Sequence, residues 1–420
     1  MEKTIFTGYA PNLSFNDLRV ALKFIFLPWN WRGWKHGNGA REAEKFLQEY
    51  FSAKNVNVVD SGRSALLISL QVIGVGKGDD VIVQAFTCLV VINAITKLGA
   101  NPIFVDICRD TNMDILDLKR KITPKTKAII IQHTFGIPAE IDELTSFAKT
   151  RSLPVIEDCA HSLGAVLREK KIGTFGDIGI LSFGSDKIIS CVRGGAIVTN
   201  NDSFAKKITD IRNDLPDTST QKIFQHLMHY PIFFLGKKFY HILLGKILLW
   251  TAKKINLTNR IIYNEEKKGE PMGDYPSKLP EALAQILLLQ LNRLSTIIAH
   301  RKLVAKKYED EIKNPQVVLP CRELTFEKKS GGVYLRYPIL TKNPYKLYQH
   351  AKNNGIILGN WYDTVVSPYR GVTARIDYLP GSCPNAEYFS KHIVNLPTDI
   401  IIGQKEQRKI IDVINSYKEE

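Results

Sequence analysis

The stretch Asp177-Ile-Gly-Ile-Leu-Ser-Phe-Gly-Ser-Asp-Lys-Ile-Ile-Ser-Cys-Val-Arg-Gly-Gly195 is the part of this chain from which its fold can be inferred. The short apolar run from Ile178 to Phe183 has the character of a strand, and it ends in small residues before Lys187. Apart from the neighbouring Asp186, no residue between Ile178 and Val192 is charged. A lysine in apolar surroundings loses its proton more readily, and imine chemistry with an aldehyde requires that loss. A solvated lysine just past a strand is the simpler interpretation of this stretch alone.

A second feature, upstream of Lys187, gives this lysine a chemical partner. The run Leu153-Pro-Val-Ile-Glu-Asp158 has the pattern of a buried parallel strand with Asp158 at its carboxyl end, and His161 follows shortly after. Parallel α/β sheets bind ligands at that edge. Pyridoxal phosphate needs a lysine that forms an imine and a carboxylate that holds a proton on the pyridine nitrogen. Lys187 and Asp158 together therefore predict a pyridoxal phosphate site, which neither residue predicts alone.

Four short motifs resemble those of one enzyme family. Glu157-Asp-Cys-Ala-His161, Gly173-Thr-Phe-Gly176, Ser182-Phe-Gly-Ser-Asp-Lys187 and Gly194-Gly195 have the order and spacing seen in the DegT/DnrJ-type sugar aminotransferases. The similarity runs from about Phe46 to Asn200 and returns more faintly after Tyr275. It implies the fold of the fold-type I pyridoxal phosphate enzymes, a mostly parallel sheet sandwiched by helices with a smaller C-terminal α/β domain. The alternation of strand and helix patterns along the chain indicates the same α/β class.

The turn Ser61-Gly62 joins a strand pattern to an apolar helix. A glycine turn at a helix amino terminus offers free N–H groups and a favourable dipole to a phosphate. The resemblance implies that this turn binds the cofactor phosphate together with Ser182, and that a threonine normally follows the glycine. Arg63 stands at that position here. Its guanidinium could pair with the phosphate directly, while the hydroxyl contact is either lost or passed to Ser64.

The resemblance also implies contacts to the cofactor ring. The family commonly stacks an aromatic side chain on the ring at the position that Cys88 occupies in this chain. Phe86, two residues earlier, either replaces that aromatic side chain or belongs to the core. His161 is expected beside the ring oxygen or against Asp158, where it would orient the carboxylate.

Composition and charge limit the classes of protein to be considered. The chain has 420 residues, of which 44% are hydrophobic and 24% charged, as is usual for globular proteins. Its six cysteines form no close pair and no metal-ligand spacing, which predicts neither disulfides nor a bound metal and fits a reducing cytoplasm. The net charge of +15 suits nucleic acid, an anionic membrane or a phosphorylated substrate. No helix-turn-helix, zinc-finger or RNA-binding signature is present, so nucleic acid is not an expected partner.

The motifs and the changes in composition divide the chain into four parts. Residues 1–44 form an aromatic arm with three of the five tryptophans, 45–212 the cofactor-binding large domain, 213–275 a basic and apolar insertion, and 276–420 a linking helix with the small domain. The arm either packs on the main body or faces a membrane or the substrate. The linking helix resembles one whose asparagine and arginine reach a neighbouring subunit, although Pro276 and Lys278 stand there in this chain. The resemblance nevertheless implies a homodimer.

The insertion is unusual in its charge. Residues 218–264 contain no acidic residue but seven basic ones, namely Lys222, Lys237, Lys238, Lys246, Lys253, Lys254 and Arg260. On a helical projection, Lys246 and Lys253 share one face, while Leu244, Leu248 and Ile255 lie opposite. Two interpretations follow. The segment binds the surface of an anionic membrane without crossing it, or it is a helical pair packed on the main domain or a partner subunit, with its lysines facing water.

These observations predict an enzyme that transfers an amino group to a keto-sugar, nucleotide-linked, with glutamate as the donor implied by the resemblance. Lys187 would form the imine and then carry a proton between substrate and cofactor, while Asp158 would hold the pyridine proton. The alternative is a pyridoxal-binding regulator, or a scaffold at the membrane surface, that keeps the fold without turnover. The expected location is the cytoplasm, at the inner face of the cell membrane if the insertion binds lipid.

Overall fold

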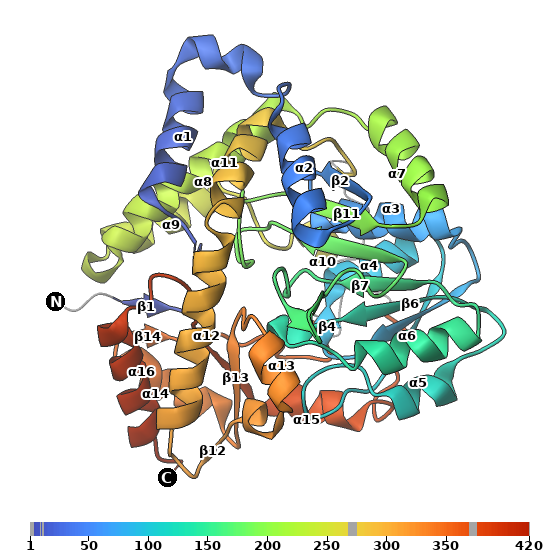
Figure 1. Cartoon of the computed structure of the whole chain (residues 1–420). Coiled ribbons are helices and arrows are strands. Elements are labelled where there is room, and N and C mark those ends of the chain that lie inside the picture. Colours follow the sequence, from blue (N-terminus) through green and yellow to red (C-terminus); the bar gives the residue numbers. More distant parts are fainter. Residues whose placement is uncertain (1–3, 9, 11, 268–274, 369–375, 420) are drawn as a thin grey trace.

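The computed structural model describes residues 4–8, 10, 12–267, 275–368 and 376–419, and it is built around a seven-stranded sheet (Figure 1). The strand order is β2(Asn55–Val59), β11(Gly195–Thr199), β10(Ile178–Ser182), β7(Val155–Asp158), β6(Thr126–Gln132), β3(Asp80–Gln84) and β5(Asn101–Val105). Only β11 runs antiparallel to its neighbours β2 and β10, and the other pairs in this sheet are parallel. The predicted α/β fold class with a mostly parallel sheet is therefore confirmed.

Helices cover both faces of this sheet. On one face lie α3(Gly62–Ile73), α4(Leu89–Lys97) and α7(Asp202–Asp214), and on the other α2(Gly39–Phe51), α5(Ile115–Lys121), α6(Ile141–Thr150) and α11(Glu281–Leu291). The inner strands are continuous runs of valine and isoleucine because both of their faces are buried. Their register aligns Gln132 with Asp158, and Asp158 with Ile180, so the carboxyl ends of β6, β7 and β10 share one edge.

The smaller domain has its own core and an antiparallel sheet. Strands β12(Val317–Val318), β13(Tyr337–Thr341) and β16(Ile393–Leu396) pack against α12(Leu294–Glu311), α14(Pro344–Asn353) and α16(Gln404–Ser416). The amino-terminal arm joins this domain, because β1(Ile5–Phe6) pairs with β14(Ile356–Ile357). Other short elements of the two domains are β4(Thr87–Cys88), β8(Val166–Leu167), β9(Lys170–Lys171), β15(Val366–Ser367), η2(Thr134–Gly136), η4(Pro320–Glu323), α13(Phe326–Gly331) and α15(Pro384–His392). The two domains together leave the edge at β6, β7 and β10 facing residues 360–368.

The insertion folds as helices α8(Thr220–Lys238), η3(Tyr240–Ile242), α9(Leu244–Lys254) and α10(Asn264–Lys267). Helix α8 packs on α11 and on α1(Phe15–Phe26) of the arm, and it buries Ile223 and Leu227 in the large-domain core. Helix α9 packs on α8 through Leu249, which lies so close to Gly236 that a Cβ there would meet it at 2.5 Å. Helix α8 thus packs on the main domain, which is one of the two arrangements that the sequence predicted for the insertion.

The outer face of α9 is different, because its apolar side chains point to solvent. Leu244 is 62% exposed, Ile247 51% and Trp250 62%. The helical projection placed Leu248 on the face opposite the lysines, but Leu248 is only half-buried against α8 and Ile247 is the more exposed residue. No single helix of the described residues is long and apolar enough to cross a membrane, while the bent pair α11 and α12 passes by length and composition alone.

Helix α8 also buries two histidines whose ring nitrogens have no hydrogen-bond partner, His226 and His229. Burial lowers the pKa of His226 well below its usual value, and the nearby cations Arg193 and Lys222 lower it further. Burial also lowers the pKa of His229, to about 3. Both rings are therefore neutral in the folded protein at pH values where an unfolded histidine is protonated.

The substitution His226→Leu is expected to reduce the sensitivity of the fold to acid. As pH falls below about 6.5, the unfolded chain takes up a proton at this histidine and the folded chain does not, so unfolding becomes more favourable. Each pH unit in that window lowers the free energy of unfolding by up to about 1.4 kcal/mol per histidine. Thermal unfolding midpoints measured from about pH 7.5 to about pH 5 should fall more steeply for the wild-type protein than for the variant. If the midpoints of the two proteins fall equally with pH, His226 is not a buried neutral histidine of the folded protein.

Candidate active site

A cavity of about 640 Å³ lies where the carboxyl edge of the sheet meets the first turn of α3, residues 360–368 and the insertion. Its volume is within the range of about 300–1,000 Å³ that is usual for ligand sites. Lys187 and Asp158 both line it, as do Gly62, His161 and Ser182. Residues far apart in the sequence are thus brought to one edge by the parallel strands.

Lys187 belongs to the loop between β10 and β11, and the arm holds its backbone in place. Asn12, which is 2% exposed, donates from its Nδ2 to the carbonyl oxygens of Lys187 at 2.7 Å and Ile188 at 2.6 Å. The Nζ of Lys187 lies 5.0 Å from the centroid of the Trp361 ring. Asn12 was not predicted from the sequence, because no local pattern links residue 12 to this loop. Its role follows only from the folded arm.

Asp158 ends β7 and presents a buried carboxylate to the cavity. Its Oδ1 accepts a hydrogen bond of 3.0 Å from the N–H of Ala160. Burial raises the pKa of Asp158, while that hydrogen bond and the charge of Lys187 oppose the rise. A positively charged ring N–H bound at this carboxylate would favour its ionised form. The carboxylate therefore fits the pyridine nitrogen of pyridoxal phosphate.

His161 lies in a stack of aromatic rings that borders the cavity. Its ring is parallel to those of Trp361 and Phe135, with centroids 5.5 Å and 6.2 Å away, and its Nδ1 accepts from the Phe135 N–H at 3.4 Å. The Tyr362 hydroxyl lies 3.4 Å from its Nε2. Burial, followed by the charges of Lys187 and Arg336, lowers the pKa of His161 well below its usual value. A neutral imidazole thus faces the cavity.

The turn that the sequence predicts to bind phosphate lies at the amino terminus of α3. Ser61 is the N-cap and accepts from the Ser64 N–H at 3.2 Å, which leaves the N–H groups of Gly62 and Arg63 at the first turn. A Cβ on Gly62 would lie 2.8 Å from the Cβ of Ser182, so glycine is what lets α3 approach the end of β10. The Ser64 side chain is fully buried and donates to Asp60, and it does not line the cavity.

Arg63 lines the cavity, but its guanidinium already has partners. It is paired with Glu266 of the insertion, which is 1% exposed, and with the carbonyl oxygen of Ile261. The sequence left direct pairing with a phosphate as one option for Arg63. The structure instead binds this arginine to the insertion, because Glu266 supplies a buried carboxylate that needs a cation.

Arg193 is a cavity residue that the sequence reasoning missed. It is 7% exposed, its Nε donates to Asp60 Oδ2 at 3.2 Å, and its Nη2 has no hydrogen-bond partner. Buried N–H groups are nearly always satisfied, so an unpaired one beside the Gly62 turn suits an anion. A signal was present in the sequence, since Arg193 is the first charged residue after Lys187 and directly precedes Gly194.

Phe86 and Cys88, the two positions considered for a contact with the cofactor ring, lie in different surroundings. Cys88 lines the cavity, and burial raises the pKa of its thiol. Phe86 is fully buried, packs edge-on against Phe135, Tyr362 and Phe389, and does not line the cavity, so it takes the core role. The aromatic ring beside Lys187 comes from Trp361 in the small domain, far from residue 88 in sequence.

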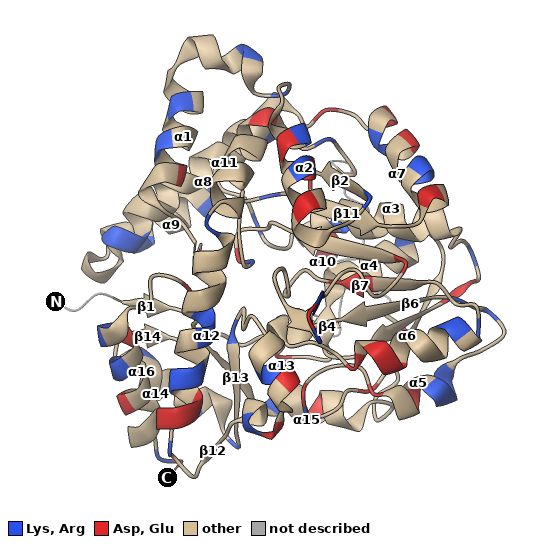
Figure 2. Cartoon of the chain, in the orientation of Figure 1, with Lys and Arg blue, Asp and Glu red and all other residues tan. Residues whose placement is uncertain are grey.

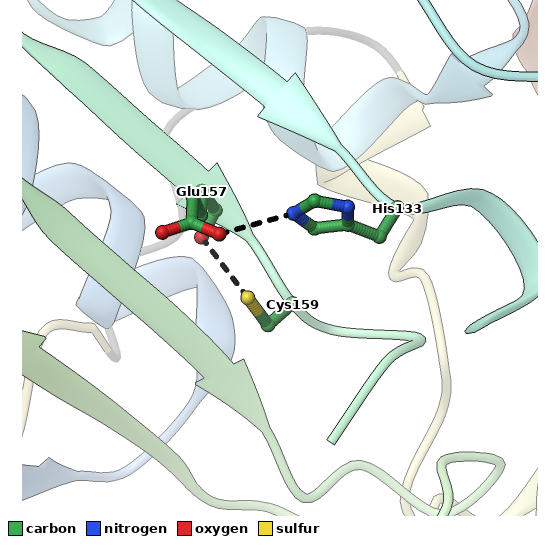
Figure 3. A group of neighbouring side chains, drawn as sticks. All are labelled: His133, Glu157 and Cys159. Atoms are coloured by element: carbon green, nitrogen blue, oxygen red, sulfur yellow. Dashed lines mark hydrogen bonds and ion pairs between the residues drawn. The ribbon is translucent and has the colours of Figure 1, made fainter. Parts of the chain in front are cut away.

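A cluster of His133, Glu157 and Cys159 lies behind the site, close enough to suggest a metal ion (Figure 3). Its donor atoms already have partners. Glu157 accepts from the N–H groups of Gly173, Phe175 and Gly176 and contacts His133 Nε2 at 3.2 Å. His133 Nδ1 accepts from the Ala139 N–H, and burial keeps the pKa of Cys159 well above its usual value. The cluster thus anchors the loop after β9, and this set of engaged donors does not fit a metal site.

Comparisons with known proteins agree with this geometry. The model of the DegT/DnrJ/EryC1/StrS aminotransferase family matches residues 29–415. GDP-perosamine synthase from Escherichia coli O157:H7 is 40% identical over 166 residues, which are 39% of this chain and 46% of that protein. The dTDP-3-amino-3,6-dideoxy-alpha-D-galactopyranose transaminase of Aneurinibacillus thermoaerophilus is 26% identical over 384 residues, which are 91% of this chain and 90% of that protein.

Among solved structures, the aminotransferase PseC of Helicobacter pylori has a TM-score of 0.74 at 21% identity, with 98% of each chain covered. The match to the GDP-perosamine synthases of three organisms spans about half of their length, namely 46%, 55% and 54%. The family model, in contrast, extends over both domains described above. The chain belongs to the DegT/DnrJ/EryC1/StrS aminotransferase family.

Proposed function

We propose that the protein is a pyridoxal phosphate-dependent aminotransferase that moves an amino group from glutamate to the keto group of a nucleotide-linked sugar. The observation that carries the proposal is that Lys187 and Asp158 line one cavity beside the turn at Gly62. The names of the relatives, which refer to GDP-linked and dTDP-linked sugars, support a nucleotide-sugar substrate. We further propose that the protein is a homodimer and that it resides in the cytoplasm. The mass of the protein in solution tests the homodimer.

Pyridoxal phosphate, when bound, supplies an aldehyde for imine formation and a ring that accepts electrons. Asp158 holds the proton on the ring nitrogen, because its buried carboxylate has the Ala160 N–H as its one described hydrogen-bond donor. Lys187 moves a proton to and from the substrate carbon, with its backbone fixed by Asn12. His161, held neutral by burial and stacked on Trp361, lines the same cavity as Asp158. Gly62, Ser182 and Arg193, which line the cavity together, would hold the phosphate.

The first test uses Lys187→Ala. Borohydride reduction of the wild-type protein with pyridoxal phosphate should attach the cofactor covalently to Lys187, as seen by peptide mass spectrometry. In a separate, unreduced sample, addition of glutamate should yield 2-oxoglutarate. The variant should show neither result, because it lacks the amine. Lys253→Gln, which changes another cavity lysine, is the matched control and should retain the covalent attachment.

Full attachment to another lysine in Lys187→Ala would show that Lys187 is the wrong residue. Attachment to Lys187 in the wild-type protein, with no 2-oxoglutarate formed from glutamate and no other amine accepted, would favour the non-catalytic regulator instead.

The second test concerns Arg193 and the phosphate. Arg193→Met should weaken binding of pyridoxal phosphate about tenfold or more, since a hydrogen bond to a charged group contributes about 1.5–3 kcal/mol. Titration of cofactor-free protein, followed by absorbance, measures this affinity. Pyridoxal without phosphate is the control ligand, and its affinity should change little. Equal weakening of both ligands would mean that Arg193 only supports the fold through Asp60.

We also propose that the protein binds the face of an anionic membrane through a surface made by two neighbouring segments. Exposed large apolar side chains gather on the arm and on the insertion, which contact each other through α1 and α8 (Figure 1). Those that are more than half exposed are, on the arm, Phe15, Phe26, Trp29 and Trp31, the last two in η1(Pro28–Gly33), and on the insertion Leu243, Leu244, Ile247, Trp250 and Ile255. We call these nine residues the apolar surface. The arm thus exposes two of its three tryptophans and buries Trp34.

The charges around the apolar surface select an anionic partner. Residues 218–264 have no carboxylate. The acidic residue of α1, Asp17, is fully buried and bound to Arg293. The ribbons of α1 and α9 carry lysine or arginine positions, which are blue in Figure 2. Each basic residue near an anionic bilayer contributes about 1 kcal/mol, and exposed tryptophans suit the headgroup layer.

Sedimentation with vesicles tests this surface. The wild-type protein should sediment with vesicles rich in phosphatidylglycerol, less so at high salt, and not with pure phosphatidylcholine. The double variant Ile247→Gln/Trp250→Gln should lose most of this binding, whereas Phe326→Gln, which changes an 83% exposed residue on α13, should retain it. Absence of vesicle binding by the wild-type protein would refute the surface. A drop in the mass of the soluble variant, with vesicle binding unchanged, would assign the surface to a second copy of the chain.

A further inference from the structure

The insertion forms a wall of the cavity, in addition to the outer surface described above. His229 and Phe233 of α8, Leu249 and Lys253 of α9, and the loop 258–262 all line it. The cofactor residues Lys187, Asp158 and Gly62 come from the large domain. One side of the cavity is thus built from a segment that no cofactor contact requires.

His229 is the first sign of a ligand on this wall. It is 3% exposed, yet neither of its ring nitrogens has a hydrogen-bond partner. Its ring stacks on that of Phe233, with centroids 3.9 Å apart and planes at 18°. A neutral imidazole offers one donor and one acceptor, and a buried ring that uses neither loses free energy. The two rings therefore line the cavity as a stacked pair, and both ring nitrogens of His229 are left unused.

Two cations lie on the same wall. The Nη2 of Arg260 donates to the backbone carbonyl oxygen of Lys253 at 3.1 Å and to Asn256 Oδ1 at 2.6 Å, which fixes the Arg260 side chain at the end of α9. The Nε of Arg260 is buried without a partner. No carboxylate of the described residues pairs with Lys253 or Arg260, whereas Arg63 and Arg193 are each bound to one. The charge on this wall is thus not neutralised within the protein.

These cations are separate from those assigned to the cofactor. The α3 turn, Ser182 and Arg193, all of them in the large domain, would hold the phosphate of pyridoxal phosphate. A substrate that carries its own phosphates needs further cations, because placing a second anion in a cavity without them is costly. Lys253 and Arg260 meet that need.

We propose that the insertion wall is the subsite for the nucleoside diphosphate part of the sugar substrate. Lys253 and Arg260 bind the diphosphate, and the stacked pair of His229 and Phe233 packs against a ring of the nucleoside. This assignment rests on the proposed function and adds to it the residues that select the activated form of the sugar. The sugar itself then extends from this wall toward Lys187.

The experiment measures binding of UDP, GDP and dTDP to the cofactor-loaded protein by calorimetry, with inorganic pyrophosphate as a fourth probe. At least one nucleoside diphosphate should bind to the wild-type protein. Lys253→Gln/Arg260→Gln should weaken that binding, and pyrophosphate binding, about tenfold or more. His229→Leu should weaken the nucleoside diphosphate but not pyrophosphate. Lys246→Gln/Lys254→Gln, which changes two exposed lysines of α9 outside the cavity, is the matched control and should bind like the wild-type protein.

Each outcome decides the assignment. Affinities that are unchanged in Lys253→Gln/Arg260→Gln, or equally reduced in the control pair, would overturn it, as would a wild-type protein that binds none of the four probes at millimolar concentration. Titration of each variant with pyridoxal phosphate should give wild-type affinity, which shows that the fold and the cofactor site are intact. Cofactor binding and transamination with no nucleotide binding would refute this subsite and leave the aminotransferase proposal standing. Nucleotide binding without transamination would support the subsite and count against the aminotransferase proposal.

Discussion

The carboxylate of Asp60 is the constraint on which the site depends. It is 3% exposed, its Oδ1 accepts from the Ser64 hydroxyl and from the Ser277 N–H, and its Oδ2 accepts from Arg193 Nε. One buried charge therefore joins the first turn of α3, the loop after Lys187 and the segment that leads into α11. A buried charge without partners would cost several kcal/mol, so these three elements are held in one arrangement. The position of the α3 turn and the unpaired Nη2 of Arg193 are consequences of that arrangement.

Close backbone contacts at two glycines also hold α3 against the ends of β10 and β11. A Cβ on Gly195 would lie 2.4 Å from the Ser61 carbonyl, and one on Gly62 would lie 2.8 Å from Ser182. Glycine at both positions therefore brings β11, β10 and α3 nearer than side chains allow. The apolar strands supply stability, but these contacts determine where the N–H groups of α3 point. The site thus depends on the absence of side chains as well as on the residues that carry the chemistry.

The sequence predicted the fold and part of the site because that information is local. Strand patterns ending in Asp158 and Ser182, and a glycine turn before α3, place their residues at one edge whatever the rest of the chain does. The partners of Arg63 could not be predicted, since Glu266 lies 203 residues away and nothing near Arg63 indicates it. The same holds for Trp361, which comes from the small domain, and for Asn12. Contacts between distant segments depend on packing, which no short pattern encodes.

The insertion links two surfaces of the molecule through one short helix. On α9, Leu249 and the solvent-exposed Lys253 line the cavity, while Leu244, Ile247 and Trp250 lie on the outer face. A ligand on either side of α9 therefore acts on a helix that the other side also uses. The buried side chains between α8 and α9, namely Leu249, Ile232 and Ala252, form a cluster of their own, separate from the cores of the two domains, so α9 is held less firmly than the core helices. If lipid orders α9, it also orders the wall that carries Lys253, and by linkage a ligand on that wall strengthens the membrane contact by the same factor.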